Sequence, residues 1–469
     1  MRSHRPEFLL ALLALTVTAA SVGCAEEDGR KPSDAHLDAG TSDASQVDAG
    51  PSDAGLDDAA LPDAGHPPAD AGPGAGMLCG SVSYDRRPIG ATGLGAVTAE
   101  PLAGATVLLL RGGAEADRSL SDERGGFCFG ALDEGESVEV RVLASDELEL
   151  PAEVTDFYAA LYSVRAGPFV VGAGPVTIRI TQGENAGAFA IFETMRGGLL
   201  FARTAFARAD LFPTQSNRWE KGNSTPGGTS YFAGDAIWLL GGPMDTDEYD
   251  TAVILHELGH YIEAVYGATD TGSGSPHAGA DTDPRLAWSE GWATHFSNLA
   301  SGSGEYLDSY GDGIALNYDV ATLPLSGEYA GNASGGLSQN LSEWLIAASL
   351  YRLYEADTPA TQSARMMAVI RDWFDPLVTD RGAGGGDFVD YLDGYLCLNA
   401  DLHHELIMSH IVGERTFPYD FAGSCPAPKP GRPYDALSAD LNDRREPPGQ
   451  VLTDARGRTL REAHIDRVR

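Results

Sequence analysis

The chain has 469 residues, of which 32 are lysine or arginine and 68 are aspartate or glutamate, so its formal net charge is -36 at pH 7. A negative charge of this size repels the phosphates of nucleic acids and anionic membrane surfaces, and nucleic acid is therefore excluded as an expected partner. The length is sufficient for two or three domains, and the 43% content of hydrophobic residues is typical of a globular protein.

Residues 1–23 have the layout of an export signal. A charged start precedes an apolar run from Leu9 to Ala20, which is too short to span a bilayer stably, and small residues follow it. The segment SVGC resembles a bacterial lipobox, which implies that Cys24 is lipidated after cleavage. Ser21 stands where lipoboxes usually carry leucine, so cleavage after Ala20 by an ordinary signal peptidase is the alternative. The resemblance predicts an exported lipoprotein of the cell envelope or outer membrane, facing the periplasm or exterior and touching the membrane only through its lipid anchor.

Residues 24–76 are predicted to form a disordered tether. The segment consists mainly of Asp, Ala, Gly, Pro and Ser, and the tripeptide DAG recurs in it five times. It has almost no large apolar side chains to bury, so the entropy lost on ordering cannot be offset. No D-x-D-x-D-G loop is present, which favours a solvated spacer over a calcium-binding segment.

Residues 77–182 are predicted to form an all-β sandwich. Short β-branched runs alternate with Gly and Pro turns, and strands are expected at residues 79–85, 104–112, 125–132, 137–144 and 175–180. The segments PLAGATVLLL and SDERGGFCFGAL resemble the carboxypeptidase regulatory-like domain. This resemblance implies a prealbumin-like sandwich of about seven strands that acts as an accessory or spacer module.

Five cysteines are present, and lipidation of Cys24 leaves four. An even number of cysteines in an exported chain is consistent with disulfide bonds. Local pairing joins Cys79 with Cys128 and Cys397 with Cys425. No C-x-x-C pair occurs, so a cysteine zinc site or a thioredoxin-like redox site has no support.

From residue 183 to residue 428 the spacing of apolar residues becomes helical. Two short strands, at residues 218–220 and 236–240, could form the sheet edge against which a substrate lies. Whether residues 183–207 belong to the core or form a removable propeptide stays open. Residues 429–469, rich in Pro, Asp and Arg, are predicted to be a loosely ordered tail. Helices are expected at residues 186–207, 248–265, 286–300, 340–356, 361–373 and 387–398.

The segment EYDTAVILHELGHYIEAVYG carries an H-E-x-x-H pattern. His256 and His260 are four residues apart and project from one face of a helix, so both imidazoles can reach one Zn²⁺ ion. Glu257 is placed to act as the base that takes a proton from an activated water. The alternative is that both histidines are surface or packing residues. The pattern arises by chance in only roughly one or two of a hundred such chains, which favours the metal site.

A third ligand decides the class of metal site. Glu263 and Tyr266 stand where metzincins carry glycine and histidine, so that class is excluded. The segment LAWSEGWATHFSNL resembles the second metal helix of gluzincins, especially the NEGFA-like segment of gluzincin aminopeptidases. This resemblance implies that Glu290 is the third zinc ligand and that water takes the open fourth position. Asp270, in YGATD, loosely resembles the aspzincin segment GTxxD and is the rival ligand.

Two positions depart from the gluzincin pattern. No GxMEN segment is present, so exopeptidase action has no support. Thr294 stands where thermolysin-like enzymes carry an aspartate that holds a ligand histidine, so that support is expected from elsewhere.

The donor that stabilises the oxyanion is expected to be His277, in a Gly-rich loop between the two metal helices. Other candidates for this role are His295, Tyr231, Tyr310 and Tyr318. His403, His404 and His410 are interpreted as packing or helix-surface residues.

These features predict a multidomain chain in which an all-β sandwich (77–182) precedes a mainly α (α+β) zincin-like metallopeptidase domain (183–428). The implied function is zinc-dependent hydrolysis of peptide bonds by a monomeric endopeptidase acting on protein or peptide substrates. The alternative from another class is a non-catalytic surface protein that uses a peptidase-like domain for adhesion or recognition. The intact Glu257 favours the enzyme, because a purely structural zinc site needs no base.

Overall fold

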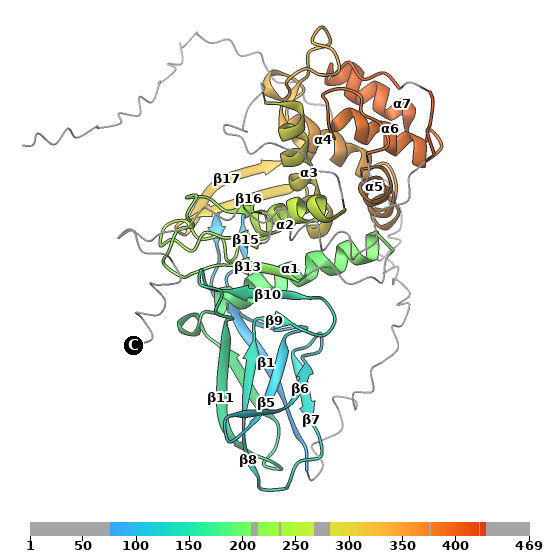
Figure 1. Cartoon of the computed structure of the whole chain (residues 1–469). Helices are drawn as coiled ribbons and strands as arrows, with labels where there is room; N and C mark the ends of the chain where they lie inside the picture. Colours follow the sequence, from blue (N-terminus) through green and yellow to red (C-terminus); the bar gives the residue numbers. More distant parts are fainter. Residues whose placement is uncertain are drawn as a thin grey trace, which may run out of the picture. The chain divides into compact units, whose positions relative to one another are not determined.

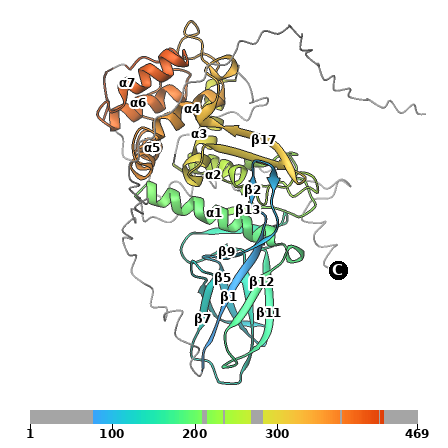
Figure 2. The same cartoon turned by 180° about the vertical axis from the view of Figure 1, so that it is seen from behind.

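The computed structural model describes residues 76–207, 214–233, 236–266, 282–374, 377–421 and 423–427. The predicted signal peptide, Cys24, the tether up to residue 75 and the tail from residue 429 lie outside these ranges, as do His277 and Asp270. None of the described helices is long and apolar enough to cross a membrane. A β-rich region comes first and a helical region follows, which confirms the predicted order of β and α structure (Figure 1 and Figure 2).

Strand β1 (Leu78–Arg86) pairs with each of the other three strands of the first sheet. It pairs in parallel with β12 (Val176–Ile180) and antiparallel with β4 (Thr98–Pro101) and β7 (Gly126–Phe129). Val82 and Tyr84, two residues apart, are both buried, as expected for a strand with one face on a core. Cys79 on β1 lies opposite Cys128 on β7, and the two form the first of the predicted disulfides.

The second sheet has four antiparallel strands, in the order β11 (Ser163–Val170), β8 (Ser137–Leu143), β5 (Thr106–Arg111) and β6 (Ala114–Leu120). Alternate valines of β8 are buried in the same core as residues of the first sheet. The predicted strands correspond to β1, β5, β7, β8 and β12. The sequence did not predict β6 because this edge strand is polar and mostly exposed, nor β11 because Pro168 interrupts its pattern.

A third sheet combines two parts of the chain that the sequence assigned to different domains. Its order is β14 (Tyr231–Ala233), β15 (Ala236–Trp238), β13 (Gln215–Arg218), β10 (Ala152–Thr155) and β9 (Ser145–Asp146). Strands β10, β13 and β15 are parallel neighbours, whereas β14 pairs antiparallel with β15. The expectation that the strands near residues 218–220 and 236–240 form a sheet edge is wrong, because β13 and β15 are interior and the outer strands are β14 and β9.

All six predicted helices are present, with ends shifted by a few residues. Local signals set some of these ends: Asp283 caps a helix whose first residue is Pro284, and Asp387 and Ser342 cap two others through their side chains. The helices are α1 (Ala186–Ala205), α2 (Thr251–Tyr266), α3 (Pro284–Ser301), α4 (Glu343–Tyr354), α5 (Pro359–Trp373), α6 (Phe388–Leu398) and the short α7 (His404–Ile407).

Helix α1 is part of the folded core. Phe189 and Phe192 are fully buried, and Gly198 lies so close to α2 that an added Cβ would come within 2.4 Å of the Leu258 side chain. The Glu193 carboxylate accepts hydrogen bonds from Tyr84 and Arg86 of β1. Helix α1, within the segment 183–207, therefore packs as an integral element of the described fold.

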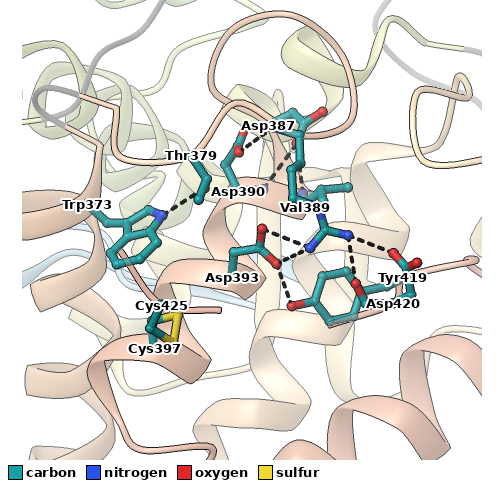
Figure 3. A network of polar contacts seen from close by, with 11 residues as sticks. Trp373, Thr379, Asp387, Val389, Asp390, Asp393, Cys397, Tyr419, Asp420 and Cys425 are labelled. Atoms are coloured by element: carbon teal, nitrogen blue, oxygen red, sulfur yellow. Dashed lines mark hydrogen bonds and ion pairs between the residues drawn. A yellow bond between two sulfur atoms is a disulfide. The ribbon is translucent and has the colours of Figure 1, made fainter. Parts of the chain in front are cut away.

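A network of polar contacts holds the last described residues against α6 (Figure 3). Asp393 accepts a hydrogen bond of 2.9 Å from the Tyr419 hydroxyl. It also forms an ion pair with Arg381 at 2.8 Å, and Arg381 forms a second ion pair with Asp420 at 2.6 Å. The second predicted disulfide, Cys397 with Cys425, is present in the same region. The helical region also contains a hairpin that the sequence did not predict, β16 (Glu305–Tyr310) with β17 (Gly313–Asp319), and β16 contacts α2.

Candidate metal centre

Two neighbouring helices bring three potential metal ligands together. His256 and His260 lie one turn apart on α2, and Glu290 lies on α3. Glu290 Oε2 is 3.1 Å from His256 Nε2 and 3.4 Å from His260 Nε2, and the two Nε2 atoms are 3.2 Å apart. The three atoms therefore form a nearly equilateral triangle.

This triangle fits Zn²⁺ in both donor type and size. Two imidazole nitrogens and one carboxylate oxygen form a common ligand set for a catalytic zinc site. A tetrahedral zinc ion with bonds of about 2.0–2.2 Å separates neighbouring ligand atoms by about 3.3 Å. The observed separations of 3.1, 3.2 and 3.4 Å agree with that spacing.

The charges in this cluster are strongly coupled. Burial raises the pKa of Glu290, but the two imidazoles outweigh this effect, and the pKa lies well below its ordinary value. Burial lowers the pKa of His260, yet Glu290 and neighbouring carboxylates raise it to about 9. A positive charge beside Glu290, from a proton or from a metal ion, is thus favoured.

Residues next to the ligands orient both imidazole rings. Ser289 Oγ donates a hydrogen bond of 2.7 Å to the buried Glu263 and lies 3.2 Å from His260 Nδ1. Since that hydroxyl proton goes to Glu263, the serine oxygen accepts from Nδ1–H and leaves the His260 Nε2 lone pair for a metal. Thr294 Oγ1 lies 3.2 Å from His256 Nδ1. The expectation that position 294 gives no support to a ligand histidine is therefore wrong, because a hydroxyl there reaches the ring.

Glu257 follows the first histidine and is only 7% exposed. Burial raises its pKa above the ordinary value, although His256 and His260 and a hydrogen bond from the backbone N–H of Phe232 act in the opposite direction. Phe232 belongs to β14, one of the two outer strands of the five-stranded sheet. Glu257 thus lies between the triangle of ligand atoms and a sheet edge.

Tyr306 is an aromatic neighbour of the centre that the sequence did not single out. Its ring, on β16, lies 5.9 Å from the His256 ring, nearly perpendicular to it. Burial, followed by the charge of Glu257, raises its pKa well above the ordinary value, so the phenol stays protonated and can donate a hydrogen bond. The signal that could have found it is the alternation in EYLDSY, which was passed over because the hairpin was not predicted.

The other candidate oxyanion donors have contacts of their own or fall outside the described residues. His277 is among the latter. His295 is fully buried and burial lowers its pKa to about 3, so it is a neutral core residue. Tyr231 stacks on Trp238, the Tyr318 ring packs at a tilt against Trp344, and Tyr310 is exposed. The packing interpretation agrees with the contacts of the three late histidines: His403 stacks on Tyr395, His404 contacts Phe421 and His410 pairs with Glu414.

The close approach of α2 and α3 depends on Gly259, between the two histidines. A Cβ at this position would lie 2.8 Å from the Ala293 Cα. We expect Gly259→Ala to push the helices apart, to lower the free energy of unfolding by about 1–3 kcal/mol and to weaken zinc binding. Gly197→Ala is the matched control, since Gly197 lies on the exposed face of α1 and a Cβ there meets open space, so this change is expected to stabilise by about 0.5–1 kcal/mol. Urea denaturation measures both, and equal stability of the two variants would contradict the packing argument.

The structure thus brings His256, His260 and Glu290 together with Glu257 beside them, whereas Asp270 lies outside the described residues. No family model matches the chain, and no curated protein matches it. The chemistry of this cluster is therefore inferred from its geometry.

Proposed function

We propose that this chain is a zinc-dependent endopeptidase whose metal is held by His256, His260 and Glu290. The observation that carries the proposal is the triangle of ligand atoms with edges of 3.1–3.4 Å beside the buried carboxylate of Glu257. Three protein ligands leave a fourth position for water, which is typical of catalytic rather than structural zinc sites.

The bound Zn²⁺ would polarise a carbonyl group and lower the pKa of water at the site. Glu257 accepts a proton from the water whose oxygen attacks the peptide carbonyl carbon. When the carbon–nitrogen bond breaks, Glu257 returns that proton to the leaving amine. The low exposure of Glu257 suits this exchange, because burial raises the pKa of its carboxyl group toward that of a working base.

Strand β14 is proposed to position the substrate. It is one of the two outer strands of its sheet in the described part of the chain, and its Phe232 contacts Glu257 through the backbone. An extended peptide that adds to such an edge forms main-chain hydrogen bonds and passes beside the base. Binding along a strand edge needs no free peptide terminus, which favours internal cleavage.

Tyr306 is proposed to stabilise the oxyanion. Tyr306→Phe removes the hydroxyl but keeps the ring, so we expect kcat to fall by about 10²- to 10³-fold with KM and zinc content nearly unchanged. Tyr310→Phe, an exposed tyrosine of the same strand, is the matched control and should retain full activity. An unchanged kcat for Tyr306→Phe would show that another group stabilises the oxyanion, and His277 would then be a candidate.

The remaining features suit an exported enzyme. The lipobox-like segment at Cys24 and the acidic tether are consistent with a lipoprotein held away from a membrane surface. The two four-stranded β-sheets are consistent with a prealbumin-like accessory sandwich ahead of a zincin-like domain.

The direct test is to measure the zinc content of the purified chain and its cleavage of casein. One zinc per chain, cleavage at internal bonds, loss of cleavage with a chelator and recovery with Zn²⁺ are expected. Protein that holds one zinc but cleaves neither casein nor mixed peptides would favour the adhesion or recognition alternative.

A further inference from the structure

A second group of potential metal ligands lies apart from the histidines and consists only of carboxylates. Asp245 and Asp247 belong to the segment between β15 and α2, and Asp308 lies on β16. One oxygen from each lies within 4.8 Å of the others. Asp247 is buried and the other two are half-buried. The segment before α2 and strand β16, which are distant in the sequence, thus bring three carboxylates close together.

A fourth carboxylate, that of Asp250, neighbours Asp247 and Asp308. Asp250 is fully buried, and its Oδ2 accepts hydrogen bonds of 2.8 Å from both the backbone N–H and the hydroxyl of Ser309. Its other oxygen, Oδ1, has no hydrogen-bond partner among the described residues, and neither does Asp308 Oδ1. The Asp250 and Asp308 side chains are in contact. A buried carboxylate oxygen without a donor requires a proton or a cation.

Burial and neighbouring carboxylates raise the pKa values of Asp247 and Asp308. Burial raises the pKa of Asp247 well above its ordinary value, and the charges of Asp250, Asp308 and Asp245 raise it further. Burial and Asp245 likewise raise the pKa of Asp308 to about 6. The groups that act most strongly on these two residues are carboxylates and hydroxyls, with no lysine or arginine among them. Protons or a bound metal ion can neutralise this concentration of negative charge.

We propose that Asp245, Asp247 and Asp308 bind a Ca²⁺ ion, with Asp250 completing the cluster of oxygen ligands. Ca²⁺ takes oxygen ligands only and accepts irregular arrangements of six to eight of them, which backbone carbonyls and water can complete. Zn²⁺ prefers nitrogen and sulfur, so the histidine centre and this site select different metals.

The Ca²⁺ site ties together the elements that flank the histidine centre. Asp250 immediately precedes α2, which carries Glu257, and Asp308 lies two residues from Tyr306. A direct contact already joins the same segments, because the backbone N–H of Gly311 donates a hydrogen bond of 2.6 Å to the carbonyl of Met244. Bound Ca²⁺ therefore stabilises the start of α2 against β16.

The test titrates Ca²⁺ into the full chain after removal of calcium and addition of one equivalent of Zn²⁺. Calorimetry is expected to detect one binding event, and Tm to rise by about 5 °C at Ca²⁺ concentrations about 100 times Kd. Asp308→Asn is expected to bind Ca²⁺ at least about tenfold more weakly and to lose the rise in Tm. Without Ca²⁺, this variant should unfold at the same or a higher temperature than the wild type, because repulsion is relieved.

Asp312→Asn is the matched control, since this aspartate lies in the turn after β16 with its side chain 83% exposed. Asp312→Asn should keep the full rise in Tm with Ca²⁺, whereas Asp247→Asn and Asp308→Asn should both lose it. An unchanged response in Asp308→Asn and Asp247→Asn would assign Ca²⁺ binding to other acidic residues and overturn the proposal. Stabilisation by Mg²⁺ equal to that by Ca²⁺ would overturn the choice of metal. Glu290→Ala should keep the rise in Tm with Ca²⁺ although it loses zinc. A failure of the proposed zinc centre is thereby distinguished from a failure of the Ca²⁺ site.

Discussion

Glu257→Gln is expected to lower the rate of peptide hydrolysis by about 10²- to 10⁴-fold while one zinc per chain stays bound. Glutamine has nearly the same shape as glutamate and keeps an oxygen for the backbone N–H of Phe232, but it cannot take a proton from water. The three proposed ligands are untouched by the change. The expected separation of activity from metal content is measured by steady-state peptide hydrolysis beside elemental analysis.

Glu305→Gln is the matched control for this variant, because Glu305 is an exposed residue at the start of β16. It should hydrolyse peptides at the wild-type rate. If Glu257→Gln retains activity within about twofold of wild type, another group is the general base and the role assigned to Glu257 is wrong.

Glu290→Ala is expected to weaken zinc binding by more than about 100-fold and to abolish hydrolysis. The change removes one corner of the triangle and the carboxylate that favours a cation beside His256 and His260. Two imidazoles alone hold zinc less tightly than a set of three ligands with a negative charge. Competition with a chromophoric chelator measures the affinity, and circular dichroism checks that the variant is folded.

Glu405→Ala, an exposed glutamate on α7, serves as the control and should bind zinc normally. Asp270→Ala separates the two candidate third ligands. Normal zinc affinity in Glu290→Ala, combined with loss of zinc in Asp270→Ala, would transfer the third-ligand role to Asp270.

The parts of the structure that follow from short-range rules were predicted from the sequence. The apolar spacing around residues 251–266 predicts a helix, and a separation of four residues then places His256 and His260 on one face. Pro284 and the capping aspartates mark helix starts for equally local reasons. Alternating valines identify β8, whereas β6 and β11 lack such a pattern and were not predicted.

The resemblance of the α3 sequence to gluzincins proposed Glu290 as a ligand, but only the packing of α2 on α3 gives the distances between the three ligand atoms. Contacts between residues far apart in the sequence also decided the roles of Ser289, Glu263 and Thr294 and the position of Tyr306. The sequence determined which side chains with suitable chemistry lie on each helix, because helix spacing is a property of the local backbone. The tertiary structure decided which of them meet, including the carboxylates of Asp247 and Asp308, because their distance depends on packing over about sixty intervening residues.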